Sequence, residues 1–201
     1  MEMLQNNICV YNLRTLIHIV PEDALTNLLN SFSSPQNPDV EHFLKTNSVD
    51  FTNKSQSVTY LVFSSENEDL LGYFSLAIKP VSIQIDVLSK SQLKKLRRVS
   101  NIDETSSSIT LSAYLIAQLG KNYSIPKEKR IDGTKLLNMA YDKIVSLKHD
   151  VGGIAAFLEC EENDFLLDFY TRNNHFEFGT RETKDTVKNK NVILHQFLKF
   201  L

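Results

Sequence analysis

The chain has 201 residues and a mass of 23.0 kDa, and 42% of its residues are hydrophobic. A chain of this size can bury a substantial core, and we predict one domain over residues 1–201. The formal net charge of −2 excludes a globally basic protein, so any contact with nucleic acid or an anionic surface depends on a local patch.

The two cysteines, Cys9 and Cys160, are too few for a disulfide framework, and no cysteine or histidine group has the spacing of zinc ligands. The N-terminal residues form no basic leader, and no apolar run is long enough to span a bilayer. We therefore expect a cytoplasmic protein with no metal site and no membrane partner.

The N-terminal half is expected to form a strand, two short helices and a hairpin. Residues 7–20 alternate imperfectly between apolar and polar, which predicts a strand that ends in a turn at Pro21. The two helices and the two strands of an antiparallel hairpin are expected at residues 23–32, 40–44, 57–63 and 71–78.

Residues 82–108 depart from this pattern, and we interpret them as a basic insertion, part helix and part mobile loop. Five cations lie within a short span of it: Lys90, Lys94, Lys95, Arg97 and Arg98. Such a run could bind RNA phosphates or an acidic protein partner. Alternatively, it is the solvated face of a helix.

The C-terminal half alternates between strands and helices. Residues 109–119 are β-rich, as expected for a central strand, and residues 134–148 carry apolar side chains on one helical face. Gly152 and Gly153 end this helix. The remaining strand, helix and two further strands are expected at residues 154–160, 163–174, 176–178 and 192–198. This order predicts an α/β fold with a mixed sheet and helices on both faces.

The loop before the helix of residues 134–148 has the features of an anion site. A helix N-terminus leaves main-chain N–H groups free, and Gly133 allows close approach of a ligand. Positive charge comes from Lys127, Lys129 and Arg130. A single glycine is a weak motif, so the alternative is an ordinary solvated loop capped by Asp132 or Thr134.

The helix expected over residues 163–174 carries a second candidate group. Asn163 or Asp164 caps its start, and Asn174 stands where a left-handed residue often ends a helix. Tyr170 falls in the last turn, where a phenol could donate a proton to a departing thiolate. Its alternative role is an aromatic packing residue beside Phe169.

These residues resemble the Asn-x-x-Ala-hydrophobic-x-x-Tyr-x-x-x-Gly-Phe signature of the GNAT N-acyltransferase superfamily. The matching positions are Asn163, Leu166, Leu167, Phe169, Tyr170 and residues 174–176. The preceding strand, loop and helix resemble the acyl-CoA site of that family. The resemblance extends over residues 8–198, and it is strongest to bacterial members that include acetyltransferase toxins, on the segments 60–63, 72–74 and 118–119.

The resemblance implies a mixed, mainly antiparallel GNAT-type sheet with a splayed central strand pair. Main-chain groups of Leu119, Gly120 and Lys121 would then pair with the pantetheine arm of the cofactor. Asn163 would hydrogen-bond the same arm, and Tyr170 would be the general acid near the sulfur. The residues that would hold the phosphates are Lys129, Arg130, Ile131, Asp132, Gly133 and Thr134.

The glycine motif of the family fits this loop in two registers. In one, Gly133 is the final glycine, Glu128 replaces the usual Arg or Gln, and Ile131 replaces the first Gly. In the other, Arg130 and Gly133 fit, but Lys135 takes a position that is usually small. This eroded motif supports a degenerate domain that binds CoA without turnover, whereas Asn163 and Tyr170 in register support an enzyme.

The resemblance therefore implies an acetyl-CoA-dependent N-acetyltransferase in which a neutral primary amine attacks the thioester directly. The acceptor could be the amino group of an aminoacyl-tRNA, which would make the protein a toxin with an antitoxin partner. A small-molecule or protein amine is the alternative acceptor, and a homodimer is compatible with either. The central strand has no Asp or Glu, and Glu159 could be a solvent-facing strand end. We therefore expect a water-mediated proton path.

Overall fold

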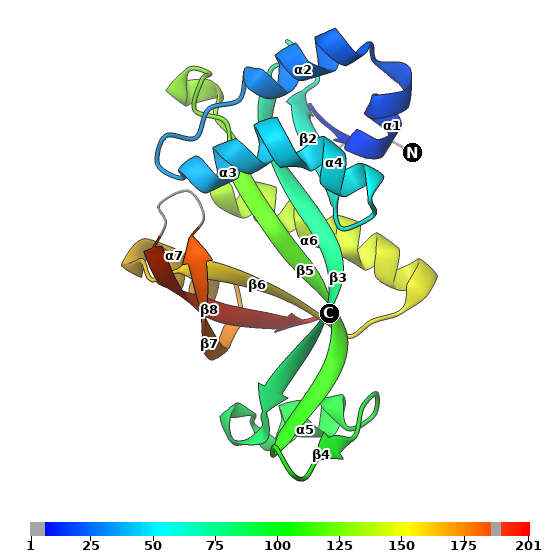
Figure 1. Cartoon of the computed structure of the whole chain (residues 1–201), viewed down its shortest axis with the longest axis vertical. Helices are drawn as coiled ribbons and strands as arrows, with labels where there is room; N and C mark the ends of the chain where they lie inside the picture. The colour runs from blue at the N-terminus through cyan, green and yellow to red at the C-terminus, as the bar shows by residue number, and fades with distance from the viewer. Residues whose placement is uncertain (1–6, 186–189) are drawn as a thin grey trace. The chain divides into compact units, whose positions relative to one another are not determined.

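The computed structural model describes residues 7–185 and 190–201 (Figure 1). The chain divides into two compact units. The first comprises Met1–Ala77 and Ile116–Lys143, and the second comprises Ile78–Leu115 and Ile144–Leu201. The prediction of one domain over residues 1–201 stays a prediction.

The first unit begins with strand β1 (Ile8–Asn12), which pairs antiparallel with β2 (Val58–Ser64). A helix, α1 (Leu13–Ile19), follows at once, so the prediction of a strand as far as residue 20 is wrong. Helix starts here because the Asn12 side chain accepts a hydrogen bond from the Arg14 N–H (2.9 Å). Leu13 and Leu16, three residues apart, then lie buried on one helical face.

Helix α2 (Glu22–Asn30) confirms the first predicted helix. The second is longer than predicted, because α3 (Pro38–His42) continues through a π-helical turn (Phe43–Asn47) into α4 (Ser48–Asn53). Asn37 caps its start by accepting from the Val40 N–H (3.4 Å). Farther along, the buried Ser48 hydroxyl donates to the Leu44 carbonyl (2.6 Å), which satisfies this hydroxyl inside the core.

The predicted antiparallel hairpin is confirmed as β2 and β3 (Leu70–Gln84). The expected central strand is β5 (Ser108–Lys121), and after a 3₁₀ turn (Lys127–Lys129) the chain enters helix α6 (Gly133–Val151). As predicted, two glycines end this helix, with φ of 78° at Gly152 and 106° at Gly153.

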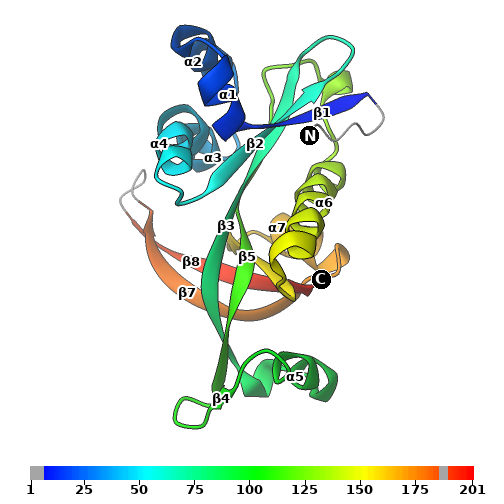
Figure 2. The ribbon, with the colours of Figure 1, turned by 90° about the vertical axis from the view of Figure 1, so that its right-hand side faces the viewer.

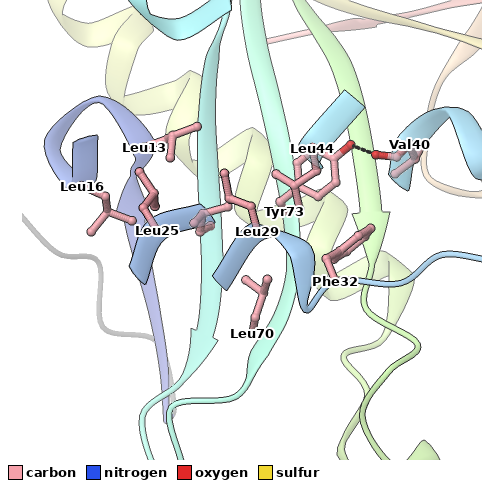
Figure 3. Packing of buried hydrophobic residues seen from close by; sticks show 10 residues of the cluster. Leu13, Leu16, Leu25, Leu29, Phe32, Val40, Leu44, Leu70 and Tyr73 are labelled. Carbon is pink, nitrogen blue, oxygen red and sulfur yellow. Dashed lines mark hydrogen bonds between the residues drawn. The ribbon is translucent and has the colours of Figure 1, made fainter. Parts of the chain in front are cut away.

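The first unit buries a core between its N-terminal helices and the sheet, as Figure 3 shows. Its members are Leu13, Leu16, Leu25, Leu29, Phe32, Val40, Leu44, Leu61, Leu70 and Tyr73. The Tyr73 hydroxyl donates to the Val40 carbonyl (2.6 Å), which satisfies two buried polar groups. Since side chains alternate along a strand, the neighbouring Gly72 faces the other side, where a Cβ would lie 3.3 Å from Leu136 of α6. Helices therefore cover both faces of this part of the sheet.

The second unit contains the end of β3 and the start of β5, which lie side by side (Figure 2). Between them lie a 3₁₀ turn (Ile85–Val87), helix α5 (Lys90–Leu96) and the short strand β4 (Ile102–Asp103), which pairs with β5. The predicted helical part of the basic insertion is confirmed. The hydrophobic core of the second unit includes Val81, Ile83, Leu96, Ile109 and Leu111, together with Phe157, Phe178 and Leu198.

The remainder of the second unit consists of β6 (Ala155–Glu161), α7 (Asp164–Arg172), β7 (Phe176–Asp185) and β8 (Lys190–Phe200). Strand β8 pairs antiparallel with both β6 and β7. Leu198 belongs to the core that contains Leu96 of α5, whereas the adjacent Phe197 contacts Tyr170 of α7 (ring centroids 5.7 Å apart). Because neighbouring strand residues face opposite sides, α7 packs on the Phe197 face of β8, and the core that contains Leu96 lies on the Leu198 face.

Within the described residues, the strands form one eight-stranded sheet in the order β1-β2-β3-β5-β6-β8-β7, with β4 beside β5. The pair β5–β6 is parallel and the sheet is otherwise mainly antiparallel. This confirms the predicted mixed α/β sheet with helices on both faces, and the splay of its central pair stays a prediction. No helix among residues 7–185 and 190–201 is long and apolar enough to cross a membrane.

Candidate functional site

Helix α7 has the ends that the sequence predicted. The Asn163 side-chain oxygen accepts from the N–H groups of Phe165 (3.0 Å) and Leu166 (3.2 Å), so Asn163 is the cap. At the other end, Asn174 has a φ of 63°, the left-handed conformation that a glycine often supplies. Because its oxygen is used by the cap, Asn163 has only its amide nitrogen and main chain to offer a ligand.

Tyr170 lies in the last turn of α7, and its side chain is almost fully buried, with a residue exposure of 8%. Its ring contacts Phe169 (5.1 Å), His175 (5.7 Å) and Phe197 (5.7 Å). Burial, with a smaller contribution from Cys160, raises the pKa of Tyr170 well above its ordinary value. Its hydroxyl has no hydrogen-bond partner among the residues that the structure describes. The ring is thus a packing residue, and its hydroxyl stays protonated at neutral pH as a hydrogen-bond donor.

His175 closes the C-terminal end of α7. Its Nδ1 lies 3.0 Å from the Tyr170 carbonyl oxygen, and its main-chain N–H donates to the same oxygen (3.2 Å). Burial lowers the pKa of His175 to about 4. A neutral imidazole that donates from Nδ1 to a helix-end carbonyl has a structural role.

His195 and Glu177 form an ionisable pair that sequence reasoning missed, on the face of the sheet that α7 covers. His195 of β8 is directly opposite Cys160 of β6, and both share the face of Phe197. His195 Nδ1 is 2.7 Å from Glu177 Oε1, whereas its Nε2 is buried without a hydrogen-bond partner in the described part of the chain. Because the carboxylate fixes the proton on Nδ1, Nε2 presents a lone pair, the arrangement of a proton acceptor.

Cys160 is a poor nucleophile in this environment. Burial first, and then the charge of Glu177, raises the pKa of its thiol to about 11. The thiol is therefore protonated at neutral pH. Among the described residues, no group of three or more His, Cys, Asp or Glu side chains is placed to hold a metal ion.

Glu159 is not a solvent-facing strand end, which was one of the alternatives for this residue. It lies in the middle of β6, and its side chain is 15% exposed. Arg181 donates to both of its oxygens (2.6 and 2.5 Å), and Gln196 donates to one (2.7 Å). Burial alone would raise the pKa of Glu159, but these hydrogen bonds outweigh it and hold the pKa below its ordinary value. The carboxylate stays ionised and paired, which argues against a role as a base.

The basic residues of the loop are largely engaged with the loop itself. Arg130 donates to the main-chain oxygens of Ile125 (3.0 Å) and Tyr123 (2.9 Å), and its guanidinium lies over the Tyr123 ring (5.0 Å). Lys129 forms an ion pair with Asp69 (3.2 Å). Ile131 is buried. These three residues, predicted to hold phosphates, shape the loop in this structure.

The start of α6 is capped by its own chain, which was one of the two alternatives for this loop. The Asp132 carboxylate accepts from the N–H groups of Thr134 (2.8 Å) and Lys135 (3.2 Å). An anion bound there would have to displace this carboxylate. Asp132 is exposed, so its side chain can rotate away at a cost of about 1 kcal/mol for the lost cap. Gly133 and Lys127 then remain available to a ligand.

The end of β5 has a packing role that the sequence did not reveal. A Cβ on Gly120 would lie 2.4 Å from Val40 and 3.0 Å from Tyr73, so this glycine lets the α3 segment contact the strand. Two residues later, the Asn122 side chain accepts from the Ser33 N–H (3.0 Å) and donates to the Leu70 carbonyl (2.9 Å). Leu119, Gly120 and Lys121 thus belong to a rigid strand end.

The predicted site residues fall into two groups that belong to different units. Residues 119–121 and 129–134 lie in the first unit, at the end of β5 and the start of α6. Asn163 and Tyr170 lie in the second unit, at the two ends of α7.

Comparison with solved structures identifies the fold. The chain matches AtaT complexed with acetyl-methionyl-tRNAfMet at 17% identity and a TM-score of 0.58, over 82% of this chain and 85% of AtaT. It matches a tyrosine-to-phenylalanine mutant of KacT at 16% identity and a TM-score of 0.61, over 94% and 95%. The chain has the GNAT fold.

A further GNAT-fold match is a mutant AtaT toxin bound to the C-terminus of the antitoxin AtaR and acetyl-CoA, at 14% identity and a TM-score of 0.56, over 97% of this chain and 94% of that one. No family model and no curated protein matches the sequence. At these identities the likeness is one of fold, and the GNAT fold predicted from the sequence is confirmed.

Proposed function

We propose that the chain is an N-acetyltransferase that moves an acetyl group from acetyl-CoA to a primary amine. The observation that carries the proposal is Tyr170, a buried tyrosine with an unbonded hydroxyl in the last turn of an Asn163-capped helix of a GNAT fold. Matched structures of this fold contain acetyl-CoA in one case and an acetylated tRNA in another, which supports the reaction class.

The start of α6 can accept the diphosphate of the cosubstrate once Asp132 has rotated away. The N–H groups of Thr134 and Lys135 are then free, and Lys127 adds positive charge nearby. Acetyl-CoA supplies an acetyl thioester, whose carbonyl carbon the amine attacks while the carbon–sulfur bond breaks. The protein orients the reactants, supplies a hydrogen bond to the departing sulfur and accepts the proton that the amine loses.

Tyr170 of α7 and His195 of β8 are suited to these proton transfers. Tyr170 donates a hydrogen bond to the departing sulfur, and its raised pKa keeps the phenol protonated for that purpose. His195 Nε2 is the candidate acceptor for the proton that the amine loses, directly or through a water. The water-mediated path that we expected from the sequence stays a prediction.

The acceptor that we favour is the amino group of an aminoacyl-tRNA, in which case the protein is a toxin with an antitoxin partner. The matched AtaT structures include one with an acetylated aminoacyl-tRNA and one with the antitoxin AtaR. A small-molecule or protein amine is the alternative acceptor.

The decisive experiment is to incubate the purified chain with acetyl-CoA and each acceptor class, and to identify acetylated products by mass spectrometry beside a thiol-release assay. We expect thiol release with an acylated tRNA and its near absence in Tyr170→Phe. No thiol release with any amine, and no thermal stabilisation by acetyl-CoA, would overturn the enzyme proposal. Equal growth of cells that express wild type and Tyr170→Phe at matched levels would overturn the toxin part.

A second candidate function is CoA binding without turnover, which the Asp132 cap and the eroded glycine motif favour. The same experiment separates the two. Thermal stabilisation by acetyl-CoA without thiol release would support the binding domain.

A further inference from the structure

We infer that one side of α5 is a binding surface for the phosphate backbone of an RNA acceptor. This α5 basic face consists of Lys90 and Lys94 of the helix, Arg97 at its C-cap and Arg98 in the turn that follows. The inference rests on the proposed function, because it names the acceptor class of that reaction.

The first step is the orientation of α5. A capping box fixes where the helix begins: the Ser89 N–H donates to the Gln92 side chain (2.8 Å), and the Gln92 N–H donates to the Ser89 hydroxyl (3.3 Å). Leu96 is fully buried in the core of the second unit. With the start fixed and Leu96 inward, the helical repeat of 3.6 residues places Lys90 and Lys94 on the outer side, and Arg97, a C-cap with helical dihedral angles, continues the same side. All four are exposed.

The second step is charge. The segment of the second unit from Ile78 to Leu115 carries six Lys or Arg and three Asp or Glu, in a chain whose formal net charge is −2. Within the described residues, no carboxylate pairs with any cation of the basic face. Lys90 and Lys94 are at i, i+4 spacing within α5, where like charges destabilise a helix by about 0.2–0.5 kcal/mol. An anionic ligand would relieve this repulsion.

The third step is the class of ligand. The face is about 12 Å long, at 1.5 Å per residue, which matches several phosphates of one RNA strand. Its helical positions hold Lys, Arg and Ser91 and no apolar side chain, whereas protein interfaces depend on apolar or aromatic anchors at their centre. This composition favours a phosphate backbone over an acidic protein.

The fourth step is where the basic face lies relative to Tyr170. Lys95 of α5 lies over the ring of Phe200 (5.0 Å), whereas Tyr170 contacts Phe197, which faces the other side of the same strand, so the basic face and Tyr170 lie at different places on the second unit. A small amine cannot occupy both places at once. A folded RNA that delivers its amino end to one face can reach the other with its backbone.

The test compares two double variants of the full chain. Lys94→Gln with Arg98→Gln removes half of the basic face, and Lys54→Gln with Lys148→Gln removes two cations elsewhere as a matched control. Binding to a fluorescent deacylated tRNA is measured by anisotropy over a series of salt concentrations, and thermal melting checks that both variants fold.

For the α5 variant we expect affinity at low salt to fall about tenfold or more, and the slope of log K against log salt to become shallower by about 1.4–1.8, the value for two lost phosphate contacts. The control should resemble wild type. Equal affinity and slope in both variants would overturn the inference. Failure of wild type to bind tRNA, with salt-dependent binding of polyglutamate instead, would assign the face to an acidic protein.

Failure of this inference can be separated from failure of the proposed function. Stabilisation by acetyl-CoA and thiol release with a small amine do not require the α5 basic face, and both should be unchanged in the α5 variant. If thiol release persists and tRNA binding is unaffected by the substitutions, the acetyltransferase proposal is supported and the RNA-binding role of the α5 basic face is overturned.

Discussion

His195 and Glu177 form a hydrogen-bonded pair on the sheet face covered by α7, with Nδ1 2.7 Å from Oε1 and the opposite ring nitrogen buried without a partner in the described part of the chain. A buried, unpaired acceptor is costly, so structures keep one mainly where a ligand or water completes it. The pair therefore offers a test of the proposed proton path.

We expect His195→Gln to lower kcat of the acetyl transfer by about 100-fold or more, the usual contribution of a general base. The KM for acetyl-CoA should change little, because His195 acts on the amine. A variant whose kcat stays close to that of wild type would mean that His195 is not the proton acceptor.

Tyr170→Phe should lower the transfer rate by about 100-fold or more while leaving the free energy of unfolding almost unchanged. The hydroxyl has no partner among the described residues, and the ring contacts with Phe169, His175 and Phe197 remain. Kinetics and chemical denaturation of the same samples check both parts.

Tyr73→Phe is the matched control for that substitution. It removes a buried hydrogen bond to the Val40 carbonyl, so it should lower the free energy of unfolding by about 1 kcal/mol and leave the rate near wild type. A large rate loss in this control, or a large stability loss in Tyr170→Phe, would contradict the assignment.

Asp132→Asn should increase the affinity for acetyl-CoA by about threefold to tenfold. Asparagine caps helices as well as aspartate does, so α6 keeps its start, while the negative charge that competes with a diphosphate is removed. Titration calorimetry at low and high salt measures the effect, which should shrink as salt screens the charge. Weaker binding by the variant would mean that the phosphates bind elsewhere.

His175 should make the second unit less stable in acid. Burial holds its pKa at about 4, below the 6.5 of an unfolded histidine, so between these values the unfolded chain binds a proton that the folded one does not. Above pH 6.5 His175 does not lower the free energy of unfolding. As the pH falls toward 4, the free energy of unfolding decreases by up to about 3 kcal/mol because the unfolded chain gains a proton. Subtracting the denaturation curves of His175→Asn isolates the contribution. If the free energy of unfolding depends on pH in the same way in wild type and in His175→Asn, the contribution of His175 is ruled out.

Local signals explain what the sequence could predict. The ends of α7 were predictable because Asn163 and Asn174 determine them through their own side-chain and backbone preferences. The strand predicted as far as residue 20 was wrong because an equally local signal, the cap by Asn12, outweighed an imperfect alternation.

The pairings across the sheet could not be predicted in the same way. Glu177 reaches His195 because β7 and β8 pair in a register that shifts between Glu177 and Gly179, and nothing in the sequence marks that shift. Glu159 likewise meets Arg181 and Gln196 only through the pairing of three strands. The role of Asp132 was left between two alternatives, because a cap and a phosphate use the same N–H groups.

Asn122 ties the Ser33 segment, the start of β3 and the end of β5 to one another through a single buried side chain. Three segments fixed at one point move as one body, and Gly120 adds direct contact with Val40 at the same place. A change in the loop of residues 31–37 would therefore shift the strand end as well. Under the proposed function, a substitution in this loop would also disturb the strand end expected to hold the cosubstrate, so the loop and the strand end cannot diverge independently in this chain.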